Sequence, residues 1–403
     1  MTATRHTNNF DFSELHKRMD WYVNQDLIPF AITAVLKGKE MVDLSFHGKA
    51  DKEKGRPLNS ATILRMHSST KIACSVAAMM LWEENKFDLD DPINLYLPDF
   101  SDMRVLRGDA KDIDDNEPAS GPIRINQVMS HTAGFSYGFL EPNSIIDKAY
   151  NAARLNPMTS GSTLTLKSLC EELGKLPLVY HPGESWRYSF ATDVLAHLIE
   201  VISGQTFDQF LRERLFEPLG MIDTDFWVPE NKIERLSSMY LPTDPMDPMS
   251  AAPNLMDSSA NPRNTERPSF LSGGSGLFST FEDYLRFTRM IIEKGSLNNI
   301  QIIKPETLDL MLTNQCAPGV GVSFPVWKMS DTTFGLGFAL KNKPARGEPD
   351  TASGEFHWGG MGGTHFWWSP NADITGICMT QRMPAFWHPF SRDFKKMVYN
   401  IVT

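Results

Sequence analysis

The stretch of sequence that decides the fold is SSTKIACSVAAMMLW, residues 68–82. Its polar first turn is followed by a nearly continuous apolar run, so we predict a fully buried helix over residues 68–85. On a helix, positions i and i+3 lie on the same face. Ser68 and Lys71 are therefore expected to place a hydroxyl beside an amine at the start of a central helix, where the positive end of the helix dipole also lies.

The Ser68-x-x-Lys71 pair predicts an activated nucleophile. A serine hydroxyl is a weak nucleophile and needs a neighbouring base to take its proton. An ammonium group cannot accept a proton, so Lys71 must be neutral at that moment or pass the role to a neighbour. A capping serine and a solvated lysine are the ordinary alternative. The sequence favours the reactive pair, because it is the only S-x-x-K in the chain and an apolar helix follows it.

Tyr188 is the second candidate, within YHPGESWRYS, residues 180–189. It follows a Pro-Gly turn and precedes a helix predicted over residues 191–203. A tyrosine oxygen near an ammonium is favoured as a phenolate, which can act as base toward Ser68 and then as acid toward the leaving group. A tyrosine that only packs in the core is the alternative.

The third candidate is WGGMGGT, residues 358–364, between two predicted strands. Gly359 and Gly360 allow a substrate to approach the backbone closely. The N–H of Met361 is expected to join that of Ser68 in an oxyanion hole. A glycine-rich hairpin turn without any such role is the alternative.

Bulky side chains near this motif are candidates for the wall of a substrate pocket. His365 and Trp358 are the residues that we assign to substrate binding, although packed histidines and tryptophans are commoner than ligand-binding ones. The same region also contains His357, Trp367, Trp368, Phe386 and Trp387.

A second serine lies in the pattern G-x-S-x-G, at residues 134–138. That pattern marks a nucleophile only where a buried strand precedes it and a helix follows it. Residues 125–132 instead resemble the polar end of a helix, and residues 139–144 contain Pro142. We therefore do not expect Ser136 to be the nucleophile.

The periodicity of the remaining chain predicts a sheet built from both chain ends. Helices are expected over residues 11–26, 68–85, 191–203, 206–215, 281–294 and 390–402, and strands over 29–36, 41–46, 355–358, 364–368 and 374–381. Loops are expected over 102–121, 241–269 and 341–354. The predicted fold class is α/β (α+β), with a central antiparallel sheet flanked by helices (residues 1–60 and 270–403) and a mostly helical second domain (residues 61–269).

Composition excludes several classes of partner. The 403 residues are 41% hydrophobic, and the net charge of −10 includes no dense Lys/Arg block, so neither nucleic acid nor a membrane is an expected partner. The most apolar stretch, residues 72–82, is too short to cross a bilayer. Residues 1–9 lack the apolar segment of a secretory signal, so we expect a cytoplasmic protein.

Cysteines and histidines show no metal-binding pattern. The cysteines include no C-x-x-C pair, and no H-x-x-x-H occurs, so neither a metal nor a cofactor is expected. Buried thiols are expected rather than a disulfide. The four cysteines are Cys74, Cys170, Cys316 and Cys378.

Taken in order, the three motifs resemble those of the serine β-lactamase and penicillin-binding protein superfamily. Within it the chain is most similar to class C β-lactamases and family VIII carboxylesterases. The resemblance runs from about residue 11 to residue 402. Supporting stretches are LDDPI (89–93), SHTAG (130–134), EPLGM (217–221) and GGSGLFST (273–280).

The resemblance implies an acyl-enzyme on Ser68, with Lys71 and Tyr188 as the acid/base pair and the Ser68 and Met361 amides as the oxyanion hole. Two departures matter. Class C enzymes carry Tyr-x-Asn where this chain has Tyr188-Ser189-Phe190, and Lys-Thr-Gly where it has Trp358-Gly359-Gly360. The missing amide and ammonium help to hold a β-lactam, so ester substrates are favoured.

We therefore expect a serine carboxylesterase that acts on a small-molecule ester and needs no cofactor. A β-lactamase, a D-amino-acid peptidase or an acyltransferase on the same site remain alternatives. A non-catalytic binding protein on this fold is an alternative of another class. The sequence leaves the oligomeric state open.

Overall fold

An eight-stranded antiparallel sheet forms the centre of the computed structural model, which describes residues 10–155, 164–325, 327–385 and 388–403. The strand order is β14-β15-β16-β17-β18-β1-β2-β3. At the middle, β1 and β18 pair from Ile32 opposite Met379 to Lys37 opposite Ile374, which confirms the predicted sheet shared by both chain ends. The strands are β1 Phe30–Lys37, β2 Glu40–Asp51, β3 Arg56–Pro57, β14 Thr332–Phe334, β15 Ala339–Lys341, β16 Phe356–Gly359, β17 Thr364–Ser369 and β18 Ile374–Met379.

The opening hairpin shows why these residues form strands. β1 reads FAITAVLK and is buried on both faces, so its apolar residues run on without alternation. Gly38 makes the turn with a φ of +57°. β2 continues to Asp51, five residues beyond the predicted end, because the polar letters after Phe46 belong to a strand that is partly exposed near the sheet edge.

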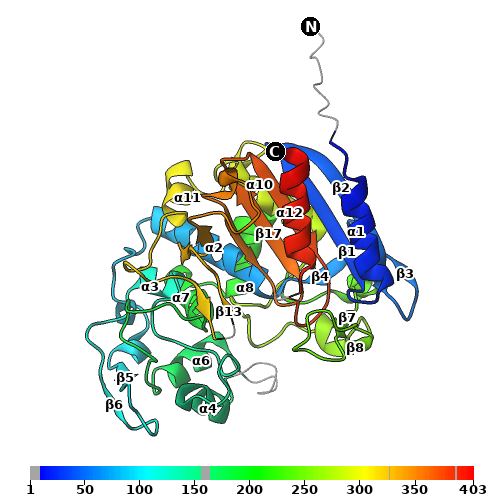
Figure 1. The fold of residues 1–403 in the computed structure, drawn as a ribbon. Coiled ribbons are helices and arrows are strands. Elements are labelled where there is room, and N and C mark those ends of the chain that lie inside the picture. The colour runs from blue at the N-terminus through cyan, green and yellow to red at the C-terminus, as the bar shows by residue number, and fades with distance from the viewer. Residues whose placement is uncertain (1–9, 156–163, 326, 386–387) are drawn as a thin grey trace.

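Helices from the two chain ends cover one face of the sheet. Figure 1 shows α1 (Ser13–Asn24) and α12 (Phe390–Val402) side by side in front of it. Their apolar residues at helical spacing join the sheet in a separate core cluster. That cluster includes Leu15, Met19, Tyr22, Phe394 and Val398.

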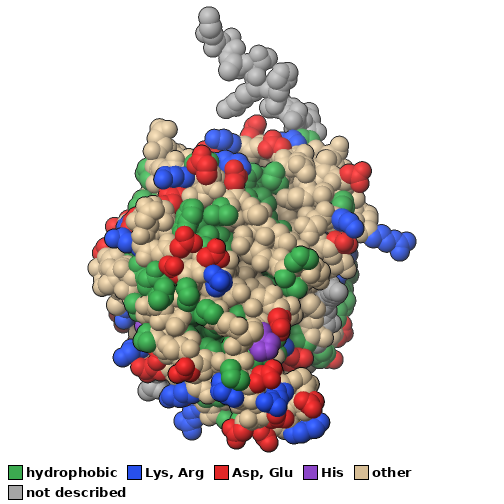
Figure 2. Space-filling model, turned by 90° about the vertical axis from the view of Figure 1, so that its left-hand side faces the viewer, with side chains coloured by type: hydrophobic (Ala, Val, Ile, Leu, Met, Phe, Trp, Pro, Cys, Tyr) green, Lys and Arg blue, Asp and Glu red, His purple; other side chains and the backbone are tan. Residues whose placement is uncertain are grey.

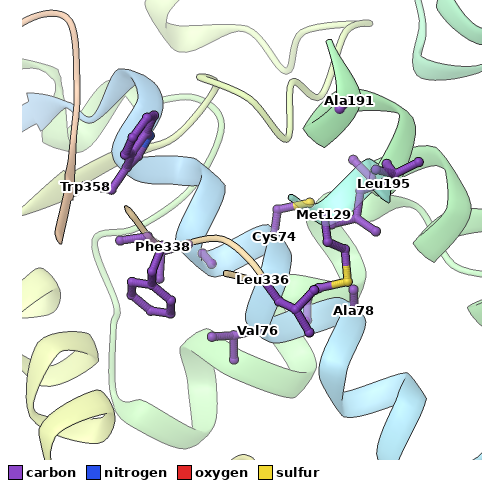
Figure 3. Packing of buried hydrophobic residues seen from close by; sticks show 14 of the residues in the cluster. Cys74, Val76, Ala78, Met129, Ala191, Leu195, Leu336, Phe338 and Trp358 are labelled. Carbon is purple, nitrogen blue, oxygen red and sulfur yellow. The ribbon is translucent and has the colours of Figure 1, made fainter. Parts of the chain in front are cut away.

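The other face is covered by α2 (Thr70–Glu83), which follows the 3₁₀ turn η1 (His67–Ser69). Every residue from 70 to 81 is buried, as the sequence predicts. Figure 3 shows α2 flanked by Met129 and Leu195 on one side and by Phe338 and Trp358 on the other. The predicted helix over 191–203 is confirmed as α7 (Ala191–Ser203), which ends at Gly204 with a φ of +72°.

The remaining elements complete the covering of α2. Figure 1 shows α3, α4, α6 and α7 gathered on the side of the molecule away from α1 and α12. These helices and turns are α3 Ile125–Met129, α4 Ile145–Ala152, α6 Leu166–Leu173, α8 Phe207–Leu211 with the π turn Arg212–Phe216, α9 Glu217–Leu219, α10 Phe281–Ile292 and α11 Pro305–Met311. Short 3₁₀ turns are η2 Ile93–Leu95, η3 Pro98–Phe100, η5 Glu230–Arg235, η6 Pro262–Thr265 and η7 Asp350–Ala352.

Two segments predicted as loops contain short strands instead. Residues 102–121 contain β5 (Arg104–Leu106) paired with β6 (Asn116–Pro118). Residues 241–269 contain β8 (Asn254–Asp257), which pairs with β7 (Met239–Leu241). Strands of three or four residues are too short for alternation to show in sequence. The other two-stranded pairs are β4 Ile63–Arg65 with β9 Phe278–Thr280, β10 Ser296–Leu297 with β11 Ile300–Gln301, and β12 Ser323–Phe324 with β13 Trp327–Lys328.

The structure also shows the state of the cysteines and the distribution of charge on one face of the molecule. All four cysteines are buried and free, which confirms that prediction. Within the described ranges, no helix has the length and apolar character needed to cross a membrane. Figure 2 shows one face of the molecule, on which acidic and basic side chains are interspersed. The expected division into residues 1–60 with 270–403 and residues 61–269 stays a prediction.

Candidate active site

Ser68 lies in η1, at the end of β4 and immediately before α2. Three hydrogen bonds tie this turn to the first residue of β17. Ser69 Oγ lies 3.0 Å from both Thr364 O and Thr364 Oγ1, and Thr364 Oγ1 donates to Met66 O at 2.9 Å. The turn is therefore fixed against the central sheet, and Ser68 is held at the junction of sheet and helix.

The Ser68 hydroxyl receives a hydrogen bond from Tyr188. The Tyr188 Oη to Ser68 Oγ distance is 2.6 Å, across 120 residues of sequence. Aromatic rings hold the phenol in place: its ring centroid lies 5.0 Å from that of His131 and 5.5 Å from that of Trp358. Trp186 stacks on it at 6.2 Å, and Phe324 of β12 packs on it at 5.5 Å.

Lys71 is buried behind this pair, with 2% of its surface exposed. Its Nζ lies 4.5 Å from the Tyr188 ring centroid. It donates to Gly274 O at 2.7 Å and to Tyr137 Oη at 3.1 Å. Tyr188 is therefore the described side chain that hydrogen-bonds to Ser68, and Lys71 lies against the ring of that tyrosine.

Tyr137 and Asp193 complete the surroundings of Lys71, and the sequence interpretation missed both. Burial raises the pKa of Tyr137 well above its usual value, and the negative charge of Asp193 adds to the rise, so this phenol stays neutral. Asp193 accepts hydrogen bonds from Ser272 Oγ at 2.6 Å and from Gly274 N at 3.0 Å. Burial raises the pKa of Asp193, although the nearby Lys71 charge opposes that rise.

The sequence contains a feature that could have drawn attention to each of these two residues. Tyr137 stands inside the G-x-S-x-G pattern, next to the serine that drew attention. Asp193 is a carboxylate in the first turn of a mostly apolar helix, and charges are seldom buried without a partner. The contact through Gly274 joins segments that are about 80 residues apart, so no local pattern shows it.

The turn between β16 and β17 lies against the Ser68 turn. A Cβ on Gly360 would overlap Met66 O and would lie 3.2 Å from His67 Cβ, so only glycine allows this approach. Met361 O accepts a hydrogen bond from Ala385 N at 2.8 Å. Among the described residues, the Met361 N–H has no acceptor, which suits the amide proposed for an oxyanion hole.

His365 is not part of this constellation. Side chains on a strand alternate between faces, and Thr364 and Phe366 of β17 face α2. His365 points to the opposite face, where its ring centroid lies 5.8 Å from that of Phe390 in α12. Burial lowers the pKa of His365 to about 4. This placement corrects the expectation that His365 lines the substrate pocket.

Ser136 lies inside the protein and has other partners. It is fully buried, donates to Asp147 Oδ1 at 2.6 Å and accepts from Arg187 Nε at 2.8 Å. No strand leads into it and no helix follows it, which agrees with the decision against Ser136 as nucleophile. Within the described ranges, no group of three or more His, Cys, Asp or Glu side chains is arranged to hold a metal ion.

Comparison with known proteins assigns the family. The model of the family described as Beta-lactamase matches residues 17–393. The chain belongs to the Beta-lactamase family. This membership agrees with the resemblance that the three motifs predicted, and with the observed antiparallel sheet flanked by helices.

Several known proteins are similar to this chain, and only some of their names state an activity. Protein Rv1367c of Mycobacterium tuberculosis is 33% identical over 367 residues, covering 89% of this chain and 87% of that protein. Esterase EstB of Burkholderia gladioli is 28% identical, covering 90% and 89%. The solved structure of EstCE1, a hydrolase with promiscuous acyltransferase activity, has a TM-score of 0.77 at 23% identity and covers 96% and 97%.

Proposed function

We propose that this protein is a serine carboxylesterase that hydrolyses small-molecule esters through an acyl-enzyme on Ser68. The observation that carries the proposal is the 2.6 Å hydrogen bond between Tyr188 Oη and Ser68 Oγ, with the Lys71 cation 4.5 Å from the centre of the same tyrosine ring. In the proposed reactive state Tyr188 is a phenolate, the form able to accept a proton, and the Lys71 cation is its neighbouring counter-charge. The similarity to Esterase EstB supports this reaction class.

Acylation follows from this geometry. Ser68 Oγ attacks the ester carbonyl carbon while its proton passes to the Tyr188 oxygen, and the C=O electron pair moves onto the carbonyl oxygen. The N–H groups of Ser68 and Met361 are the proposed donors to that oxyanion. Collapse re-forms the C=O bond and breaks the bond to the alcohol oxygen. Tyr188 returns its proton to the departing alkoxide, which leaves as alcohol.

Deacylation repeats these steps with water. Tyr188 takes one proton from the water as its oxygen attacks the acyl carbon, and the tetrahedral intermediate then expels Ser68 Oγ. Tyr188 gives the proton back to Ser68, and the free acid leaves. The same residues therefore serve both halves of the reaction, and no cofactor takes part in the proposed steps.

The walls of the site favour esters over β-lactams. Around Ser68 the positions that hold an amide and an ammonium in class C enzymes carry Phe190 and Trp358 here. Phe190 packs against the Tyr137 ring at 4.5 Å, and Trp358 packs against Tyr188. Both positions therefore present aromatic surface where a β-lactam amide or carboxylate would need a polar partner. We propose Trp358, Gly359 and Gly360 as the substrate-binding edge.

Intact mass after incubation with a p-nitrophenyl ester, and separately with a β-lactam, tests the function. Wild type is expected to show a transient acyl adduct with the ester, and Ser68→Ala to show none while its circular dichroism stays native. Full ester turnover by Ser68→Ala would overturn the proposal. Rapid turnover of the β-lactam would identify a β-lactamase instead, and ester product formed on added alcohols would identify an acyltransferase.

A further inference from the structure

Lys71 is a buried cation whose two direct hydrogen-bond partners, Gly274 O and Tyr137 Oη, carry no charge. A buried ammonium without a counter-charge is strongly unfavourable. Several titratable groups surround Lys71. Among those of the described residues, Asp193 is the one acidic side chain. The others are Cys74 on α2, His131 and Tyr137 from the 130–138 segment, Tyr188 ahead of α7 and Cys170 on α6.

Gly274 brings the two charges together. Its N–H donates to Asp193 Oδ1 at 3.0 Å, and its carbonyl accepts from Lys71 Nζ at 2.7 Å. A Cβ on Gly274 would lie 2.7 Å from Asp193 Oδ2 and 3.2 Å from Lys71 Nζ, so both charged groups converge on the space that this glycine leaves. Asp193 itself has only 1% of its surface exposed, so water does not screen the pair.

We propose that Asp193 is a positioning residue, the buried counter-ion of Lys71, and that it sets the pH window in which Ser68 is acylated. The inference rests on the proposed function, in which the reactive state combines a Tyr188 phenolate with a Lys71 ammonium. In that state the negative charge of Asp193 attracts the Lys71 ammonium and repels the Tyr188 phenolate. The acid and the alkaline limb of the profile of rate against pH are therefore both expected at higher pH than they would be without this carboxylate.

The test is the rate at which a fluorophosphonate probe labels Ser68, followed by intact mass from pH 5 to pH 10. In Asp193→Asn, which keeps the shape of the side chain but removes its charge, both limbs are expected to move to lower pH by roughly one unit. A purely structural role would lower the rate or the melting temperature but leave the limbs in place. Asp193→Ser, which also removes the charge, is expected to give the same direction of shift if the asparagine variant does not fold.

Asp283→Asn is the matched control. Asp283 on α10 is an equally buried carboxylate that accepts from Asp223 N at 2.7 Å and from Thr224 Oγ1 at 3.0 Å. Its removal is expected to leave both limbs unmoved. If wild type is labelled but the limbs do not move in the Asp193 variants, the inference about Asp193 is wrong and the proposed function still stands. Wild type that is never labelled overturns the proposed function, and the inference with it.

Discussion

At the scale of single residues, the proposed chemistry depends on the position of Tyr188. Ser68 and Lys71 share a helix turn, as the S-x-x-K spacing predicts, yet the hydrogen bonds of Lys71 go to Tyr137 and Gly274. Tyr188 alone donates to Ser68 Oγ among the described residues. In the proposed mechanism the lysine therefore acts through its charge on the tyrosine, and the tyrosine moves the proton of the nucleophile.

Ser136, the serine of the G-x-S-x-G pattern, is expected to stabilise the fold and to take no part in the reaction. Ser136→Ala removes the hydrogen bonds to Asp147 and from Arg187, and we expect a loss of about 1–3 kcal/mol in the free energy of unfolding. Ser68 and its partners are untouched, so a fluorophosphonate adduct still forms. Urea denaturation and intact mass measure the two effects. A folded Ser136→Ala protein that forms no adduct would contradict the assignment of Ser68.

At the scale of elements, motif spacing and chain direction account for what could be predicted. The apolar run after Ser68 and the Pro-Gly turn before Tyr188 mark a helix and a loop, because those signals are local. Which face of the sheet a strand residue points to is not determined by a local signal. His365 and Thr364 are neighbours in β17, yet only Thr364 faces α2, and the sequence does not say which sheet face that helix covers. Asp193 was missed in the sequence for the same reason, because its link to Lys71 runs through Gly274, which is distant in sequence.

The close approach of the β16–β17 turn to η1 gives a prediction for an element. Gly360→Ala would push a methyl group into Met66 O and Thr364 Oγ1, so the turn that carries Met361 must move away from Ser68. We expect at least a tenfold loss in kcat/KM, together with a destabilisation of about 1–3 kcal/mol. Gly121→Ala is the control, because a Cβ there meets nothing within 4 Å. Equal ester kinetics in the two variants would show that this contact does not position the site.

At the scale of the whole molecule, segments far apart in sequence are joined through Arg382. This side chain is fully buried and donates to the carbonyls of Leu27, Pro384 and Ser250, at distances of 3.0–3.1 Å. Burial lowers the pKa of Arg382 to about 10. The guanidinium thus links the start of the sheet, the Pro- and Met-rich 241–269 segment and the approach to α12. It keeps its charge at neutral pH, and this charge acts on the buried ring of His388.

His388 makes the stability of the whole chain depend on pH. Burial lowers its pKa to about 3, and the Arg382 charge adds to the effect, while Nδ1 accepts a hydrogen bond from Phe390 N at 3.2 Å. The folded protein therefore keeps this ring neutral, whereas the unfolded chain takes up a proton near pH 6.5. As the pH falls below 6.5, the unfolded state binds more protons, so the free energy of unfolding decreases, by about 2 kcal/mol at pH 5 relative to pH 8.

His388→Asn removes this titration while leaving a side-chain acceptor for Phe390 N. Urea denaturation of both proteins at pH 8 and pH 5 measures the effect. We expect the loss of stability between the two pH values to be smaller in the variant by about 2 kcal/mol, because other groups titrate equally in both proteins. The variant is less stable than wild type at pH 8 if packing around the ring suffers, but that offset is the same at pH 5. An identical pH dependence in the two proteins would mean that His388 is protonated in the folded state, and that the Arg382 side chain has room to move away from it.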